Sequence, residues 1–177
     1  MRKISNDELN RLSVDDFKTT KKFPIAVVLD NVRSMHNVGA AFRTADAFAV
    51  KKILLCGITA TPPHREIHKT ALGSTDTVEW KYFPTTTEAI QSLKKEGYKI
   101  FVVEQTDEKI FLQDFQPDTD EKYAFVFGHE VFGVSEEAVA LADAAIEIPQ
   151  FGTKHSLNIT VSLGVVVWDV VSKMLKA

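Results

Sequence analysis

The sequence predicts an α/β fold with a mostly parallel sheet flanked by helices, and three observations lead to this fold class. Continuous apolar runs of strand length recur along the chain, as expected for strands that are covered on both faces. Segments of helical character separate most of these runs, and strands that alternate with helices favour a parallel sheet. Glycines or polar side chains stand where several apolar runs end, which is where α/β proteins place ligand sites.

Composition describes an ordinary soluble globular protein of one domain. The chain has 177 residues, of which 45% are hydrophobic and 25% charged, enough for a full core. A net charge of −3 argues against a protein that coats nucleic acid non-specifically, although local basic clusters remain. We see no signal peptide or bilayer-spanning run, and the single Cys56 excludes a disulfide within the chain. We therefore expect a cytoplasmic protein.

A short polar helical leader is expected over residues 1–22, ahead of one domain over residues 23–177. Ser5-Asn-Asp-Glu8 has the pattern of a capping box that opens a short helix, and a second polar turn is expected from Ser13. This leader is too short to form a domain of its own.

The domain itself begins with a strand, Ile25-Ala-Val-Val-Leu29, and alternates from there. Runs of strand length are 25–29, 52–56, 77–80, 99–103, 123–127 and 144–148. Helices are expected at 37–48, which is rich in alanine, at 87–95, which stops at Gly97, and at 135–141, which Ser135 caps. The segment 58–74 contains Pro62-Pro63 and is expected to be a long surface loop.

The last segment, 156–177, has features of both a strand and a helix. Its many valines favour a strand locally, whereas its length and the polar stop at Lys173-Met-Leu-Lys176 favour a helix. We interpret it as a helix that is apolar on most sides and therefore heavily buried, in its own domain or against a second subunit.

Three segments carry the chemistry. They are Asn37-Val-Gly-Ala-Ala-Phe-Arg43, Gly128-His-Glu-Val-Phe-Gly133 and Ile148-Pro-Gln-Phe-Gly-Thr-Lys-His-Ser-Leu-Asn158. In this order and spacing they resemble the three motifs of the SpoU/TrmH family of RNA ribose 2′-O-methyltransferases, within the SPOUT superfamily. The resemblance runs from about Pro24 to the C-terminal helix. It implies a C-terminal trefoil knot, which general rules of topology would reject.

The resemblance also implies the site residues and the cofactor, S-adenosylmethionine. The implied catalytic residues are Arg43, Asn37, Glu130, Ser156 and Asn158. The implied cofactor-binding residues are Gly128, Ile148 and Leu157, with Val103 and Glu104 as weaker matches. His129 stands where family members often carry asparagine.

The residues themselves leave some of these roles open. A buried Arg43 needs an anionic partner, either a carboxylate such as Asp30 or Asp46 or an RNA phosphate. A guanidinium stays protonated near neutral pH, so an electrostatic clamp is easier to defend for Arg43 than a general base. Asn37 is alternatively a helix N-cap, and the alternative for Glu130 is to brace a loop.

Other chemistries lose support. The chain has no Gly-x-Gly-x-x-Gly after a strand, no Walker A sequence and no metal-like cysteine cluster. His64 and His68 lie four apart in a loop that contains prolines, and we expect no metal site. No membrane partner is expected either.

The expected substrate is tRNA or rRNA, methylated by a homodimer that forms through the C-terminal helix. RNA recognition then falls to the leader, the 58–74 segment and a partner subunit, and basic clusters lie at 18–22, 51–52 and 64–69. Two alternatives are a non-catalytic RNA-binding module with the same fold and a SPOUT enzyme that methylates a base. The Asn37/Arg43 pair favours ribose.

Overall fold

A seven-stranded parallel sheet forms the centre of the protein. The computed structural model describes residues 1–5 and 7–176. The strands are β1 (Phe23–Asp30), β2 (Val50–Cys56), β3 (Glu79–Phe83), β4 (Tyr98–Val103), β5 (Ile110–Phe111), β6 (Lys122–Phe127) and β7 (Ala144–Glu147). They lie in the order β3-β2-β1-β6-β4-β7-β5, and every pairing between them is parallel. The predicted α/β fold is confirmed.

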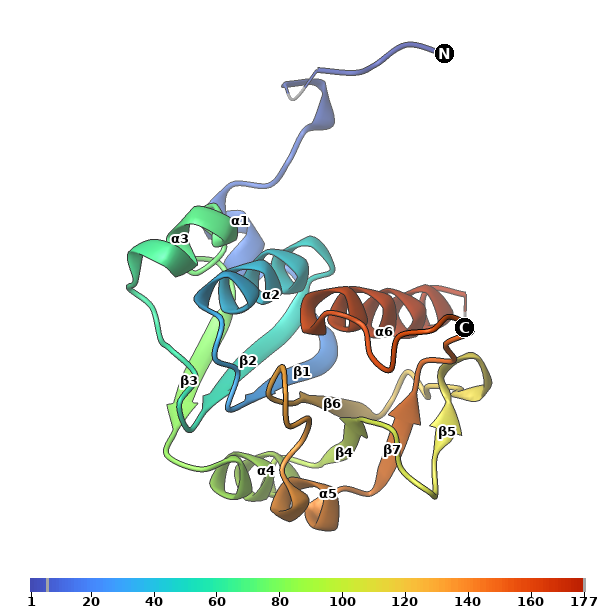
Figure 1. The fold of residues 1–177 in the computed structure, drawn as a ribbon. Helices are drawn as coiled ribbons and strands as arrows, with labels where there is room; N and C mark the ends of the chain where they lie inside the picture. Colours follow the sequence, from blue (N-terminus) through green and yellow to red (C-terminus); the bar gives the residue numbers. More distant parts are fainter. Residues whose placement is uncertain (6, 177) are drawn as a thin grey trace.

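Helices cover both faces of this sheet (Figure 1). They are α1 (Val14–Thr19), α2 (Met35–Ala47), α3 (Arg65–Ala71), α4 (Thr86–Lys95), α5 (Glu136–Leu141) and α6 (Ile159–Met174), with short 3-10 turns η1 (Asp7–Leu9) and η2 (Leu112–Asp114). Among the described residues, no helix is long and apolar enough to cross a membrane.

Strand β1 shows why the apolar runs are continuous. Ile25, Val27 and Leu29 belong to the core beneath α2 and α6, whereas Ala26 and Val28 belong to the core beneath α4 and α5. Each of these strand residues is therefore buried on one face or the other, and no polar alternation appears in the sequence.

A buried carboxylate fixes two helices at the carboxyl end of β1. Asp30 is 1% exposed and accepts hydrogen bonds from the Thr86 hydroxyl, at the start of α4, and from the Ser135 N–H, which precedes α5. The Ser135 bond measures 2.7 Å. The loops above this end of the sheet therefore start from rigid points.

The prediction of a surface loop over 58–74 was wrong, because the segment contains helix α3. Its side chains Ile67 and Ala71 are buried, and it packs so closely on α2 that a Cβ at Gly39 would lie 2.1 Å from Thr70 Oγ1. The glycine in the first motif is thus explained by helix contact. Tertiary packing stabilises this short helix, which local propensity does not predict.

Other boundaries differ by a few residues. Strand β3 begins at Glu79 rather than at 77, because Thr77 turns away to donate to Asp46 and to the Ser74 carbonyl. The two-residue strand β5 and the turn η2 were not predicted. In the leader, both predicted turns are present as η1 and α1, and residue 6 of the capping box lies outside the described residues. The part of the leader ahead of α1 extends away from the body, whereas α1 itself lies beside α3 (Figure 1).

The prediction of a heavily buried helix is confirmed for most of α6, but one apolar stripe, made of Val161, Val165 and Trp168, stays exposed in this chain. Leu163, Val167 and Val170 are fully buried against the core, whereas Val161 and Trp168 are exposed. Trp168 is 53% exposed, and its ring contacts that of Phe48, with centroids 5.6 Å apart. The helix begins at Ile159 with Asn158 as its N-cap, three residues after the predicted start at 156.

Candidate active site

A cavity of about 600 Å³ opens beyond the carboxyl ends of β4, β6 and β7. All predicted site residues except Asn37 and Arg43 line it. These residues are Val103, Glu104, Gly128, Glu130, Ile148, Ser156, Leu157 and Asn158. Parallel strands bring their carboxyl ends to one edge of the sheet, so segments far apart in the sequence meet there.

Hydrogen bonds join all three motifs beside this cavity. The Glu130 carboxylate accepts from the Asn37 side-chain amide at 2.8 Å, and Asn37 Oδ1 lies 3.4 Å from the Asn158 amide nitrogen that donates to it. Asn158 in turn caps α6, because its Oδ1 accepts from the Thr160 N–H at 2.9 Å. The side chain of Asn37 thus links a residue from each of the other two motifs.

Glu130 also braces the segment that leads into α2. Its two oxygens accept from the backbone N–H groups of Arg33 at 3.0 Å and Ser34 at 2.9 Å. Burial alone would raise the pKa of Glu130, but the bonds from Ser34, Asn37 and Arg33 outweigh it and hold the pKa below its usual value. Glu130 therefore braces this loop, as the alternative interpretation expected, and also accepts the hydrogen bond from the Asn37 side chain.

Asn37 is not the N-cap of α2. Ser34 takes that place, and its hydroxyl oxygen accepts from the Asn37 N–H at 3.3 Å. Asn37 sits inside the first turn, so its amide side chain is available to Glu130 and Asn158. The capping alternative for Asn37 was wrong.

Arg43 is exposed, contrary to the expectation of a buried arginine with an internal partner. The two carboxylates considered as partners are engaged elsewhere, Asp30 with the starts of α4 and α5 and Asp46 with Thr77. The buried side chains of α2 include Val38, Ala41, Phe42 and Ala45. Arg43 lies on the exposed face of the helix.

The loop from Gly128 to Gly133 holds its shape through backbone contacts. His129 and Gly133 exchange both backbone hydrogen bonds, each 2.9 Å long. A Cβ at Gly128 would lie 2.1 Å from the Gly133 carbonyl carbon, and Gly133 has a φ of +70°. Glu104 Oε2 accepts from the Val134 N–H at 3.0 Å, so Glu104 fixes the end of this loop.

His129, at the position where the resemblance led us to expect asparagine, forms a side-chain hydrogen bond within the loop. Its Nδ1 accepts from the Val131 N–H at 3.0 Å. On the opposite wall, the Gln105 side-chain amide donates to the His155 carbonyl at 3.0 Å and tethers the third motif. Sequence reasoning missed Gln105 and His155, which line the cavity as neighbours of predicted residues.

No group of three or more metal-ligating side chains occurs among the residues that the structure describes. The cavity is instead walled by backbone groups, the apolar side chains of Val103, Ile148 and Leu157, and the fixed loop after β6. This lining suits an organic ligand with polar edges.

The family of the chain follows from its match to known proteins. Residues 24–168 match the model of the SpoU rRNA Methylase family. The chain belongs to the SpoU family. It is 33% identical over 171 residues to the tRNA (guanosine(18)-2′-O)-methyltransferase of Thermus thermophilus, covering 96% of this chain and 86% of the relative.

Solved structures share the SpoU fold. The TrmH/SpoU tRNA modifying enzyme of A. aeolicus superposes with a TM-score of 0.81 at 23% identity, over 92% of this chain and 81% of that one. The SpoU methyltransferase AviRb of Streptomyces viridochromogenes, in complex with the cofactor AdoMet, also has a TM-score of 0.81, at 19% identity over 92% of this chain and 65% of that one.

For this SpoU protein, Gly128→Ala should disrupt the cavity. The added methyl group would meet the Gly133 backbone, so the 128–134 loop must shift, and we expect a loss of roughly 1–3 kcal/mol in stability. Ligand binding in the cavity should weaken with it. Thermal melting and calorimetry measure both effects. Gly152→Ala is the matched control, because a Cβ there meets nothing within 4 Å and its melting temperature should match wild type.

Proposed function

We propose that this SpoU protein transfers the methyl group of S-adenosylmethionine to a ribose 2′-oxygen of tRNA or rRNA. The observation that carries the proposal is the hydrogen-bonded link from Glu130 through Asn37 to Asn158 at the mouth of the cavity. It brings together polar side chains from three distant segments, in a protein whose T. thermophilus relative is a tRNA 2′-O-methyltransferase.

The cavity fits the cofactor. Adenine and ribose have polar edges that backbone amides bind and flat faces that apolar side chains cover. Gly128 supplies a backbone without a side chain, and Ile148 and Leu157 supply apolar walls. A structural neighbour, AviRb, was solved with AdoMet bound. We therefore assign Gly128, Ile148, Leu157 and Val103 to cofactor contact, and Glu104 to holding the loop.

Arg43 is assigned to the RNA. When bound, S-adenosylmethionine would supply an electrophilic methyl group and leave as S-adenosylhomocysteine. The protein must orient the 2′-hydroxyl and stabilise the negative charge that its oxygen carries as its proton passes to solvent. A protonated guanidinium does both through directed hydrogen bonds. Asn37 and Glu130 fix the start of α2, the helix that carries Arg43, and are positioning residues. Ser156 and Asn158 hold the opposite wall.

The site is completed by a second copy of the chain. Arg43 does not line the cavity of its own chain, and the helix face that bears it is exposed. The exposed face of α6, which carries Val161, Val165 and Trp168, is apolar enough to form the contact between subunits. We propose a homodimer in which Arg43 of one subunit approaches the cavity of the other.

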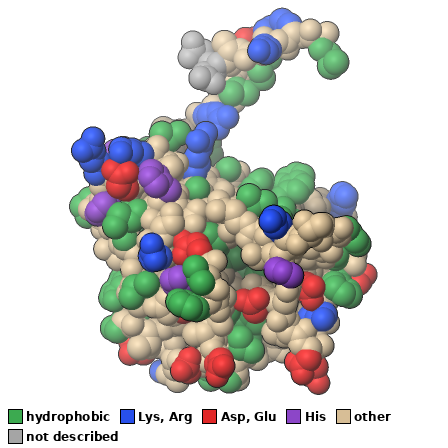
Figure 2. Space-filling view, in the orientation of Figure 1, with side chains coloured by type: hydrophobic (Ala, Val, Ile, Leu, Met, Phe, Trp, Pro, Cys, Tyr) green, Lys and Arg blue, Asp and Glu red, His purple; other side chains and the backbone are tan. Residues whose placement is uncertain are grey.

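RNA recognition is assigned to basic clusters on the surface. The leader, residues 1–22 ahead of the domain at 23–177, contributes Lys18, Lys21 and Lys22. These line one depression of about 770 Å³ together with Lys51, Lys52 and Lys122. A second cluster lies over α3, where Figure 2 shows basic and histidine side chains gathered. Both suit phosphate contacts. We place the protein in the cytoplasm, where the buried Cys56 thiol stays reduced.

S-adenosylmethionine should bind in the absence of RNA, and binding should survive EDTA. We expect this because the backbone groups and side chains that line the cavity can bind the cofactor directly, and the described residues contain no cluster of three or more metal-ligating side chains. Isothermal titration calorimetry with and without EDTA measures both statements. Absence of heat at millimolar cofactor would favour the non-catalytic RNA-binding module, and binding that EDTA abolishes would require a metal.

A further inference from the structure

We propose that His129 and Phe132 form a stacking platform for an unpaired RNA base at the mouth of the cavity. The inference rests on the proposed function, because it names how RNA is held at the same site. Stacking on aromatic side chains is the usual way in which proteins hold bases that have left a helix. Three observations support the proposal: the ring contact between His129 and Phe132, the hydrogen bond that fixes the His129 ring, and the exposure of Phe132.

Phe132 is far more exposed than is usual for a large apolar side chain. It is 83% exposed, although it sits on a loop whose ends are fixed to the protein. A phenylalanine on a rigid, exposed turn gains nothing for folding, because it buries almost no apolar surface there. A large exposed apolar side chain beside a cavity is typical of a binding surface.

The platform is rigid. The Phe132 ring packs on the His129 ring, with centroids 4.8 Å apart and planes inclined by 36°. The imidazole cannot rotate freely, because its Nδ1 accepts from the Val131 N–H. Gly133 closes the loop by two backbone bonds to His129. One face of Phe132 is therefore backed by imidazole, and the other face is open to solvent.

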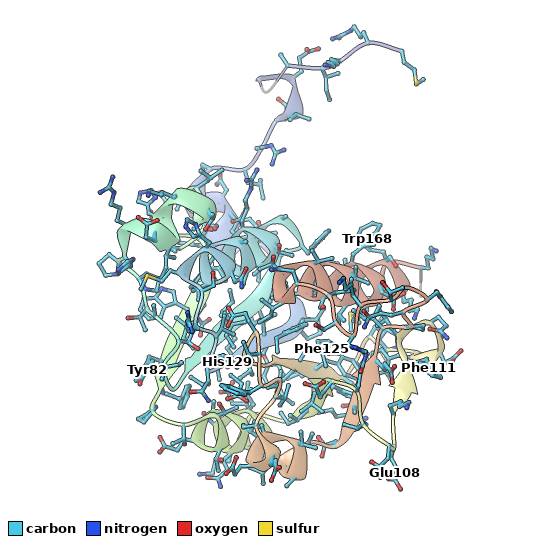
Figure 3. The ribbon with its side chains drawn as sticks, viewed as in Figure 1. Tyr82, Glu108, Phe111, Phe125, His129 and Trp168 are labelled. Carbon is cyan, nitrogen blue, oxygen red and sulfur yellow. The ribbon has the colours of Figure 1, made fainter. Side chains whose placement is uncertain are left out.

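Its position suits the nucleotide that reacts. Both rings line the cavity that also contains Gly128 and Asn158. Glu130, which holds Asn37, lies directly after His129 in the chain. Figure 3 places His129 below α2. A base stacked on Phe132 would keep its ribose beside the cavity rather than on a remote surface.

A base fits this platform better than a second protein surface does. The proposed contact between subunits lies on α6, and two side chains on one turn do not by themselves supply the roughly 1,200 Å² of buried surface that a separate stable interface needs. Charged and polar groups surround the turn, including Glu130 and the exposed Arg33. A flat ring with polar neighbours matches a nucleobase, whose faces stack and whose edges form hydrogen bonds.

Phe132→Ala should lower kcat/KM for RNA by roughly 10- to 100-fold, mainly through KM, with S-adenosylmethionine affinity unchanged. Phe132→Trp should keep activity, because it retains a flat ring. Phe132→Leu should resemble alanine, because it is apolar without a ring. Phe111→Ala is the matched control: Phe111 is an exposed aromatic residue of β5 that does not line the cavity, 39% exposed, and its truncation should leave kcat/KM within about twofold.

Several outcomes would overturn the platform. They are activity of Phe132→Ala near wild type, full activity of Phe132→Leu, or an equal loss of activity in Phe111→Ala. A Phe132→Ala protein that loses activity only because its dimer dissociates in sedimentation would mean that the residue covers a subunit contact. A wild type that binds cofactor but methylates no RNA would instead contradict the proposed function, so the two failures are distinguishable.

Discussion

Arg43→Ala should abolish methyl transfer while the affinity for S-adenosylmethionine stays nearly unchanged. Arg43 lies outside the cavity of its own chain and is assigned to the RNA, so its loss removes stabilisation of the developing oxyanion and leaves the cofactor contacts. Single-turnover methylation and calorimetry measure the two properties separately. Retained turnover within about tenfold, a loss of only ~1.4 kcal/mol in barrier, would count decisively against this role.

Two controls sharpen the result for Arg43. Arg43→Lys keeps the charge but should also be poor, because an ammonium group cannot reproduce the planar fork of a guanidinium. The melting temperature of both variants should match wild type, since the side chain is exposed and the buried face of α2 is unchanged. A lowered melting temperature would attribute the lost activity to folding.

Trp168→Asp should weaken dimerisation, and activity should fall with it. The substitution places a carboxylate on the exposed face of α6, next to Val161 and Val165, where burial against a second subunit would leave a charge without a partner. Trp168→Phe should retain the dimer, because it keeps the aromatic contact with Phe48. Sedimentation velocity and methylation assays on the same samples test the pair.

The shared site has a stricter test in mixed dimers. The Arg43→Ala chain keeps an intact cavity, and the Gly128→Ala chain keeps an intact Arg43. Each variant therefore lacks a different part of the shared active site. Heterodimers of the two should recover activity that neither parent has. A wild type that is monomeric at micromolar concentration yet fully active, or no recovery despite demonstrated subunit exchange, would place each site within one chain.

The buried part of the fold was predictable from sequence because burial leaves a direct pattern. Strands β1, β2, β4 and β6 are covered on both faces, and their runs are continuously apolar. Helix α3 was not predictable, because Pro62-Pro63 precedes it and only Ile67 and Ala71 are buried, through contact with α2. Whether such a short segment forms a helix depends on its packing against distant elements, and the local sequence does not reveal that packing.

The same limit applies to the site. The residues of the link could be predicted from the motifs, but the contact of Glu130 with Asn37 depends on β1 and β6 lying side by side in the sheet. The exposure of Arg43 depends on which face of α2 its neighbours leave uncovered. The trefoil knot that the resemblance implies stays a prediction.

The product of the reaction distinguishes all of these interpretations. The protein is incubated with methyl-labelled S-adenosylmethionine and with tRNA and rRNA from cells that lack the gene, and the RNA is digested to nucleosides for mass spectrometry. We predict label in nucleosides whose methyl group stays with the ribose when the glycosidic bond is cleaved. Label that leaves with the base would identify a base methyltransferase, and RNA without label in either substrate would contradict the catalytic function.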